Sequence, residues 1–418
     1  MVGKRCGRKQ IRVEDQGDGR THQITLEGRD SGYRIQTEGG GKTLEIDDSR
    51  WEKVINLTGY DGNECFQCGV CTAACPLGYM GEEGMDVRNL MRRAQIGLDI
   101  SEKVWNCSTC KLCEESCPRQ VSIVNVITGL RQLELEEQKA PDKIVKLLWD
   151  IYETGNPWGG KKGDRSKWAD GLNLKDAKEG TDVILYVGCD AAYNKNLHKS
   201  LRSLTDIMKR AGVNFGILGN EEKCCGEPIR NAGEKYYLDD LVHENIAQFE
   251  KTGAKTVVAF SPHCGNMFNT VYKKRGLKIE VKNYSEFLNS LIRDDKVKIE
   301  NGAHGKITIH DPCYVSRYGN GSEDLRGTFA LFPEVEVKEM LSSGKDSLCC
   351  GGGGNRMFID FEGKRLSDFR IEQARDTGAD TVITACPICN MNLLDSAKTN
   401  GVKIQVKELA EFVGENLK

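Results

Sequence analysis

The chain has 418 residues, and its 59 Lys and Arg against 62 Asp and Glu give a net charge of −3. This length predicts two or three domains, and the balanced charge argues against nucleic acid or an anionic membrane as a partner. The longest apolar runs, such as DVILYVG, are well short of the ~20 residues that cross a bilayer. Because the basic start also lacks the apolar segment of a secretory signal, we expect a cytoplasmic protein.

Cysteine is the most unusual part of the composition, with 18 residues. A chain without an export signal stays in a reducing compartment, where thiols are free and such a density indicates metal binding. Seventeen of the cysteines fall into four tight sets, whereas Cys6 stands apart in a basic N-terminal segment and is given no role.

Composition and periodicity predict five regions in chain order: a β-rich N-terminal arm at 1–50, a helical metal-binding module at 51–138, a linker at 139–180, and two α/β domains at 181–300 and 301–418. The arm alternates polar and β-prone positions between glycine turns. The helical module has apolar residues spaced by three and four. The linker is rich in Gly, Lys and Asp, and Trp158 and Trp168 are expected to pin it to the neighbouring domains.

Two short cysteine runs mark the helical module. Each follows CxxCxxCxxxCP: the first run is Cys65, Cys68, Cys71 and Cys75, and the second run is Cys107, Cys110, Cys113 and Cys117. This is the spacing of a bacterial two-cluster ferredoxin, in which the fourth cysteine of each run reaches across to the other [4Fe-4S] cubane. We therefore expect one cubane on Cys65, Cys68, Cys71 and Cys117, and another on Cys107, Cys110, Cys113 and Cys75. A structural zinc pair is the alternative, which normally takes two cysteines from each of two knuckles.

An internal duplication follows, because TGAKTVVAFSPHCGNMF at 252–268 matches TGADTVITACPICNMNL at 377–393 at a constant offset of 125. Each copy runs strand, helix, paired cysteines, helix, strand and again cysteine. This order predicts two similar α/β domains that face each other. The cysteines correspond in the two copies: Cys189 to Cys313, Cys224 and Cys225 to Cys349 and Cys350, and Cys264 to Cys389.

The second copy has five candidate ligands, Cys313, Cys349, Cys350, Cys386 and Cys389. Four thiols would complete a cubane, so a fifth predicts a cluster of unusual shape. Adjacent thiols reach two irons only from a tight turn, which the glycines at 351–354 permit while leaving the cluster uncovered by side chains. A zinc or purely structural site is the alternative, because thiolate sulfur does not by itself distinguish iron from zinc.

The duplicated order of Cys, CCG and CxxC behind a helical ferredoxin resembles heterodisulfide reductase, and the fusion looks like its D subunit, or its C and B subunits joined. The resemblance implies an α+β multidomain protein whose CCG domains bind noncubane [4Fe-4S] clusters. It implies that such a cluster on the five cysteines of the second copy splits the disulfide between coenzyme M and coenzyme B. It also implies a partner that donates electrons, either a membrane cytochrome b or a soluble flavoprotein, and peripheral membrane association through that partner.

The first copy departs from this pattern, because Ser261 stands where the second copy has Cys386. Its four cysteines, Cys189, Cys224, Cys225 and Cys264, leave open a second cluster, a zinc ion or no metal. Ser261 and His263 are the candidate substitute ligands. We therefore expect catalysis in the second copy.

Two pairs of residues near the second copy's cysteines have alternative interpretations. His310 and Asp311 suit proton donation to product thiolates, or they end a strand and cap a turn. Arg317 and Arg356 suit binding of an anionic substrate, or they form surface salt bridges. The structural interpretation is the one we favour for each residue taken singly.

Two functions fit these motifs. One is an enzyme subunit that passes electrons through two cubanes to a disulfide-reducing cluster. The other is an electron-transfer subunit without a substrate of its own, which links a flavoprotein or an acyl-CoA or hydroxyacid redox enzyme to a membrane or quinone acceptor. Ser261 adds weight to the second function, and the complete cysteine set of the second copy favours the first.

Overall fold

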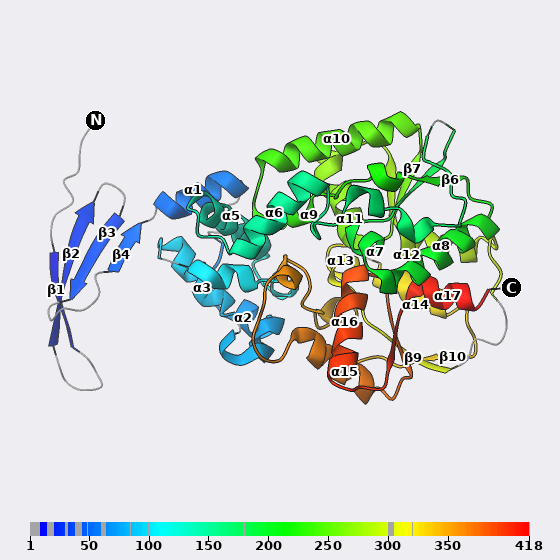
Figure 1. The fold of residues 1–418 in the computed structure, drawn as a ribbon. Helices are drawn as coiled ribbons and strands as arrows, with labels where there is room; N and C mark the ends of the chain where they lie inside the picture. The colour runs from blue at the N-terminus through cyan, green and yellow to red at the C-terminus, as the bar shows by residue number, and fades with distance from the viewer. Residues whose placement is uncertain are drawn as a thin grey trace.

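The computed structural model describes residues 9–14, 21–29, 32–37, 44–47, 49–59, 64–83, 85–98, 100–178, 180–299, 305–319 and 321–417. Cys6 lies outside the described residues. Figure 1 shows an N-terminal sheet at one end, a helical module next to it, and two α/β domains packed together beyond. This mixture of helices and parallel sheets agrees with the predicted α+β class.

The N-terminal sheet is a four-stranded antiparallel meander in the order β1-β2-β3-β4. Its strands are β1 (Lys9–Glu14), β2 (Thr21–Arg29), β3 (Gly32–Thr37) and β4 (Leu44–Asp47). In Figure 1 it lies apart from the cysteine-bearing domains and next to the start of α1.

The helical module consists of α1 (Ser49–Thr58), α2 (Val70–Ala74), α3 (Val87–Gln95), α4 (Leu112–Glu115) and α5 (Ile123–Glu136). The side chain of Asp86 accepts a hydrogen bond from the backbone N–H of Asn89, which caps the start of α3. Helix α5 is the central element, because nearly every one of its turns packs into the core of this module.

The expected linker is wrong in its first half, where α6 (Asp142–Thr154) forms a regular helix. Its buried side chains Ile144, Leu147 and Ile151 repeat at helical spacing and pack against the neighbouring domains. Trp168 is buried in the core of the first α/β domain, as a pinning residue would be. Trp158 stays 36% exposed, and its ring lies 4.7 Å from that of Phe358.

The two α/β domains have the same topology. The first contains β5 (Val183–Tyr186), β6 (Phe215–Ile217), β7 (Thr256–Ala259) and β8 (Glu280–Asn283), all parallel, in the order β6-β5-β7-β8. The second contains β9 (Gly305–Ile309), β10 (Val335–Val337), β11 (Thr381–Thr384) and β12 (Gln405–Glu408), in the order β10-β9-β11-β12. Both sheets therefore reverse their strand order between the first and third strands, as doubly wound folds do.

The two domains pack through reciprocal helix pairs. Helix α8 (His198–Arg210) of the first copy packs on α17 (Leu409–Glu415) of the second, and α12 (Tyr284–Arg293) packs on α14 (Ser322–Phe329). In each pair, the first long helix of one copy meets the last helix of the other. Apolar side chains from both copies merge into one core, so the cysteine-bearing edges are held in a fixed relation.

Among the residues that the structure describes, no helix combines the length and the apolar character needed to cross a membrane.

Candidate functional site

The fold brings the cysteines of each copy to the carboxyl edge of its sheet. Cys313 follows β9, and Cys386 and Cys389 follow β11, so they flank the point at which the strand order reverses. Ligands of open α/β sheets bind in this crevice. Cys349 and Cys350 come from a loop whose next residue, Gly351, has a φ of 83° that only glycine adopts readily.

The five thiols of the second copy lie side by side. Cys313 packs with Cys349, and Cys350 packs with Cys386 and Cys389, so the adjacent Cys349 and Cys350 join the two groups. All five side chains are buried, at most 5% exposed. A dry cluster of five adjacent soft ligands fits a cofactor with several irons better than a single tetrahedral ion, which takes four. Ligation itself stays a prediction.

The thiols differ in how readily they ionise. The hydrogen bond with Cys349, followed by burial, raises the pKa of Cys313 well above its usual value. Burial acts in the same direction on Cys386, but hydrogen bonds from Cys389 and His263 outweigh it and lower the pKa of Cys386 to about 5. Cys386 is therefore a thiolate at neutral pH, which is the form of cysteine that binds metals.

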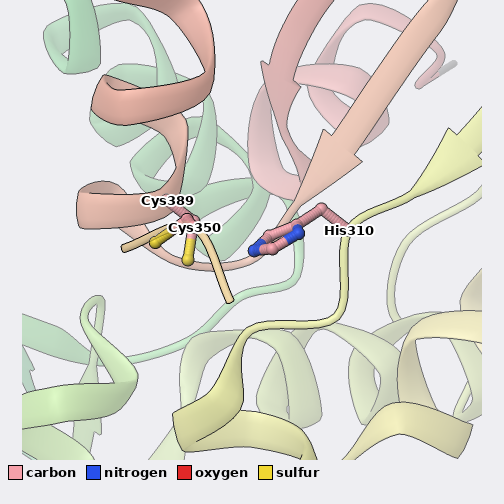
Figure 2. A group of neighbouring side chains, drawn as sticks. All are labelled: His310, Cys350 and Cys389. Carbon is pink, nitrogen blue, oxygen red and sulfur yellow. The ribbon is translucent and has the colours of Figure 1, made fainter. Parts of the chain in front are cut away.

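His310 lies beside this cluster, with its ring pointing toward the sulfurs of Cys350 and Cys389 (Figure 2). The ligand atoms of the three residues lie within 4.8 Å of one another. Arg370 donates from Nε to Nδ1 of His310 at 3.0 Å, so the neutral ring carries its proton on Nε2. Burial, followed by Arg370, holds the pKa of His310 well below 6.5. His310 is therefore neutral and no proton reservoir, and its Nε2 atom has no hydrogen-bond partner among the described residues.

Asp311 does not face the thiols. Its carboxylate pairs with Arg326 at 2.8 Å and accepts a hydrogen bond from the backbone N–H of Gly344. Although burial acts in the opposite direction, these contacts lower the pKa of Asp311, which leaves it ionised and unable to donate a proton. The structural interpretation is the one that these contacts support.

Arg317 and Arg356 are both buried, and their guanidinium groups donate to backbone carbonyls. Arg317 donates to the backbone carbonyls of Cys110 and Ser347, and Arg356 donates to the carbonyl of Asn106. A surface salt bridge is therefore wrong for both. These hydrogen bonds connect the second cysteine run and the residue before it with the second copy, which contains the Cys349 and Cys350 loop.

The glycines after Cys350 allow this close approach. A Cβ atom on Gly353 would lie 2.6 Å from the carbonyl oxygen of Ser108, and one on Gly354 would lie 2.3 Å from that of Cys107. Backbone of the second run therefore lies over these glycines, and a cluster uncovered by side chains stays a prediction. The bare backbone brings two cysteine sites together, because Cys110 packs with Cys349 and Cys313.

The two ferredoxin-type runs cross in the structure. Burial, with a further contribution from Cys110 and Cys107, raises the pKa of Cys75, so the last thiol of the first run lies among those of the second. Cys71 instead lies near Cys65 and Cys117, which line the same small pocket. These neighbours are the ones that the crossed assignment predicts, and the ligands of each cubane stay a prediction.

The first copy has a chain of four thiols, from Cys189 through Cys224 and Cys225 to Cys264. Ser261 is 1% exposed, and its Oγ has no hydrogen-bond partner among the described residues. No sequence motif pointed to Arg165, a buried residue from the supposed linker. It donates to the sulfur of Cys189 at 3.4 Å and pairs with the buried Glu222 at 2.8 Å.

His263, the other candidate ligand of the first copy, bonds elsewhere. Its Nδ1 lies 2.9 Å from Glu227, and its ring lies near Cys386 of the second copy. Although burial acts in the opposite direction, Glu227 and Cys386 raise the pKa of His263 well above 6.5. Both copies thus contribute to the surroundings of Cys386.

A cavity of about 680 Å³ opens beside Cys350. Its lining includes Arg356, Met357, Asn392 and Lys398. The volume lies within the range of about 300 to 1,000 Å³ that is typical of small-molecule sites. The cavity therefore gives a small molecule access to the edge of the five-thiol cluster.

Two family models match the chain over these same regions. The 4Fe-4S dicluster domain matches residues 61–121, and the cysteine-rich domain matches twice, at 183–269 and 307–394. The chain is therefore an iron-sulfur protein with one dicluster domain and two cysteine-rich domains.

Curated relatives narrow this class. The D subunit of the dihydromethanophenazine:CoB–CoM heterodisulfide reductase of Methanosarcina barkeri is 27% identical over 84% of this chain and 93% of that protein. The probable iron-sulfur-binding oxidoreductase FadF of Bacillus subtilis is 33% identical over 73% of this chain and 45% of that protein. The EtfAB:quinone oxidoreductase of Syntrophomonas wolfei is 26% identical over 88% of this chain and 58% of that protein.

The chain is an iron-sulfur protein of the type of the heterodisulfide reductase D subunit, as the sequence motifs predicted. It spans about half of the length of the FadF and EtfAB:quinone oxidoreductase relatives.

Proposed function

We propose that this chain is the iron-sulfur subunit of a heterodisulfide reductase-like oxidoreductase complex. Electrons pass through two cubane [4Fe-4S] clusters to a noncubane [4Fe-4S] cluster on the second copy, where a disulfide is reduced. The observation that carries the proposal is the close approach of two cysteine sites, in which Cys110 of the second run packs against Cys349 of the five-thiol chain.

The thiols divide into three proposed ligand sets: Cys65, Cys68, Cys71 and Cys117; Cys107, Cys110, Cys113 and Cys75; and Cys313, Cys349, Cys350, Cys386 and Cys389. When bound, the third cluster supplies single-electron steps and an iron site that can hold a thiolate. The polypeptide keeps these sets close through Arg317 and Arg356, whose guanidinium groups satisfy carbonyls of the second run.

Electrons enter at the first run. Cys68 is exposed, and the neighbouring Phe66 is 60% exposed, whereas Cys110 and Cys113 are buried. Among the described residues, the exposed thiol belongs to the set Cys65, Cys68, Cys71 and Cys117, here called the outer cubane, so a donor protein, either a membrane cytochrome b or a soluble flavoprotein, meets this set first. Electrons then pass from the partner to the outer cubane, next to the cubane on Cys107, Cys110, Cys113 and Cys75, and finally to the second-copy cluster.

The disulfide binds in the cavity beside Cys350. Arg356 and Lys398 add positive charge to its lining, which suits an anionic substrate such as the coenzyme M and coenzyme B heterodisulfide that the family resemblance implies. Asn392 reaches the carbonyl of Cys350 at 3.4 Å from the same wall.

A second function is a relay that has no substrate of its own. Its support is the similarity to an EtfAB:quinone oxidoreductase and the loss of one cysteine at Ser261. In that case, the second-copy cluster hands electrons to a membrane or quinone acceptor.

The test is anaerobic oxidation of a chemically reduced viologen dye by the purified, iron-replete chain, with and without the heterodisulfide. Dye oxidation that depends on the disulfide is the expected result. If every cluster is present and the disulfide changes nothing, while a quinone accepts the electrons, the relay function replaces the enzymatic one.

A further inference from the structure

An unpartnered hydrogen-bond donor lies beside the five thiols of the second copy. His310 follows β9, is 1% exposed, and its Nε2 atom has no hydrogen-bond partner among the described residues. Figure 2 shows its ring directed toward Cys350 and Cys389, and the ligand atoms of the three residues lie within 4.8 Å of one another. Buried polar groups are normally paired, so an unpaired one that faces two sulfurs indicates a binding site.

The proton on Nε2 follows from the contacts of the ring, whatever its charge. Arg370, in α15 (Leu366–Asp376), donates from Nε to Nδ1 of His310 at 3.0 Å. Guanidinium nitrogens only donate, so Nδ1 is the acceptor and Nε2 carries the proton. A protonated Nε2 has no lone pair for a metal ion, so the ring can donate to the site but not coordinate there.

The guanidinium of Arg370 is itself fixed in place. It is fully buried, and its two terminal nitrogens donate to the carbonyl of Ser342 at 2.8 Å, to Oε1 of Gln373 at 2.7 Å and to Oγ of Ser347 at 3.0 Å. These contacts leave Nε for the imidazole. Because Ser347 lies two residues before the paired cysteines, the same guanidinium connects the imidazole with the loop that carries them.

The first copy has a different pair of residues at these positions. Tyr186 corresponds to His310, and Asn245 corresponds to Arg370. The Tyr186 hydroxyl and the Asn245 amide both donate to backbone carbonyls of the first copy's cysteine loop. The pair of His310 and Arg370 therefore distinguishes the second site independently of its fifth cysteine.

We propose that His310 donates a hydrogen bond from Nε2 to the second-copy cluster and so raises the reduction potential of that cluster. The inference rests on the proposed function, because it assumes a cluster on the five thiols. Hydrogen bonds to the sulfurs help to set the potential of an iron-sulfur cluster, since a donor stabilises the extra negative charge of the reduced state. Arg370 keeps the proton on the nitrogen that faces the thiols.

The experiment is a redox titration of the iron-replete chain, followed by electron paramagnetic resonance, in the wild type, His310→Leu and His310→Gln. We expect His310→Leu to lower the midpoint potential of the second-copy cluster while both cubane potentials stay unchanged. The amide of His310→Gln can accept from Arg370 and still donate, so it should restore much of the shift. Tyr186→Phe is the matched control, because it removes the hydroxyl at the corresponding position of the first copy and should leave every potential unchanged.

Electron-nuclear double resonance of the second-copy cluster tests the hydrogen bond itself. The wild type should show a coupled proton that is absent when the cluster is assembled in D2O, and absent from His310→Leu. A strong nitrogen coupling in place of that proton would make His310 a metal ligand and overturn its role as a donor.

An unshifted second-copy potential in His310→Leu at full iron content would also overturn that role. If His310→Leu instead loses the iron of the second copy, His310→Gln decides: equal loss rejects the donor, and retained iron at nearly the wild-type potential supports it. Iron content separates this inference from the proposed function. About 8 irons in the wild type would refute the second-copy cluster itself, whereas about 12 irons with no shift would refute the role of His310 alone.

Discussion

The two cysteine-rich domains share a fold and differ in what surrounds their thiols. After the paired cysteines, the first copy continues with Glu227 into α9 (Glu227–Ala232), while the second has a run of glycines. The glycine loop lies against the second cysteine run, whereas Glu227 holds His263 through a hydrogen bond. The two copies thus use one fold to place their thiols in different surroundings.

The largest expected effect is the loss of the fifth thiol of the second copy. Cys386→Ala removes the one cysteine that the first copy lacks, so the second site should lose its noncubane cluster. We expect disulfide-dependent dye oxidation to vanish, iron to fall from about 12 to about 8 atoms per chain, and both cubanes to remain reducible.

A comparable loss of one thiol in the first copy is Cys264→Ala, at the position that corresponds to Cys389. It should leave disulfide-dependent turnover within about twofold of the wild type, because the electron path does not run through that site. Unchanged turnover in Cys386→Ala, or equal loss in both variants, would contradict the division of labour between the copies.

A large loss of stability is expected from Arg131, the residue that connects both copies to the helical module. This buried guanidinium donates to the carbonyls of Cys107 at 2.7 Å, Asn231 at 2.9 Å and Gly354 at 3.2 Å. Since each unsatisfied buried acceptor costs about 1–3 kcal/mol, Arg131→Met should lower the free energy of unfolding by at least about 3 kcal/mol.

Denaturant unfolding followed by iron-sulfur absorbance and by tryptophan fluorescence measures this change. The exposed Arg119→Met is the control and should stay within about 0.5 kcal/mol of the wild type. If Arg131→Met also lowered the free energy of unfolding by no more than about 0.5 kcal/mol, the domains would hold together without Arg131.

A smaller effect is expected where the glycine loop meets the second run. Gly353→Ala would push a Cβ against the carbonyl of Ser108, at 2.6 Å before relaxation. Overpacking of this kind costs about 1–3 kcal/mol, and it should separate Cys110 from Cys349 and slow reduction of the second-copy cluster. Stopped-flow reduction, with Gly163→Ala as a control that meets no atom within 4 Å, tests this. Equal rates in both variants would show that the close approach does not limit transfer.

The sequence alone predicts those regions of the fold in which cysteines or whole segments recur at a fixed spacing. The two cysteine runs, the offset of 125 residues and the alternating strands and helices predicted the helical module and both α/β domains. Helix α6 was missed because the Gly- and Lys-rich residues after Thr154 dominated the composition of that segment.

The contacts around the thiols were not predictable, because they join residues far apart in the chain. Glu227 and Tyr314 are separated by 87 residues, and Arg317 and Cys110 by 207. Arginines near cysteines suggested a substrate or a salt bridge, but a buried arginine can also satisfy backbone carbonyls, and only the packed structure shows which. Tertiary position decided each role.

The smallest expected effect is a gain in the first copy. Ser261→Cys supplies the missing thiol at a buried position whose side chain faces the four-thiol chain, since both its Cβ and the Cys264 sulfur lie within 4 Å of where a Cβ on Gly188 would stand. The exchange of one oxygen for sulfur should change stability by less than about 1.5 kcal/mol. If the fifth ligand is all that separates the copies, iron should rise from about 12 toward about 16 atoms per chain.

Iron analysis and electron paramagnetic resonance of Ser261→Cys decide this point, with Ser261→Ala as the control that adds no ligand. A rise in iron without faster disulfide reduction would mean that the first site can hold a cluster but lies off the electron path. If the iron content does not rise, the missing cysteine is not the whole difference between the copies, and Arg165 and Glu227 contribute to it as well. Arg165 donates a hydrogen bond to the sulfur of Cys189, and Glu227 stands where the second copy has glycine. The first copy would then differ from a cluster site in more than its missing cysteine.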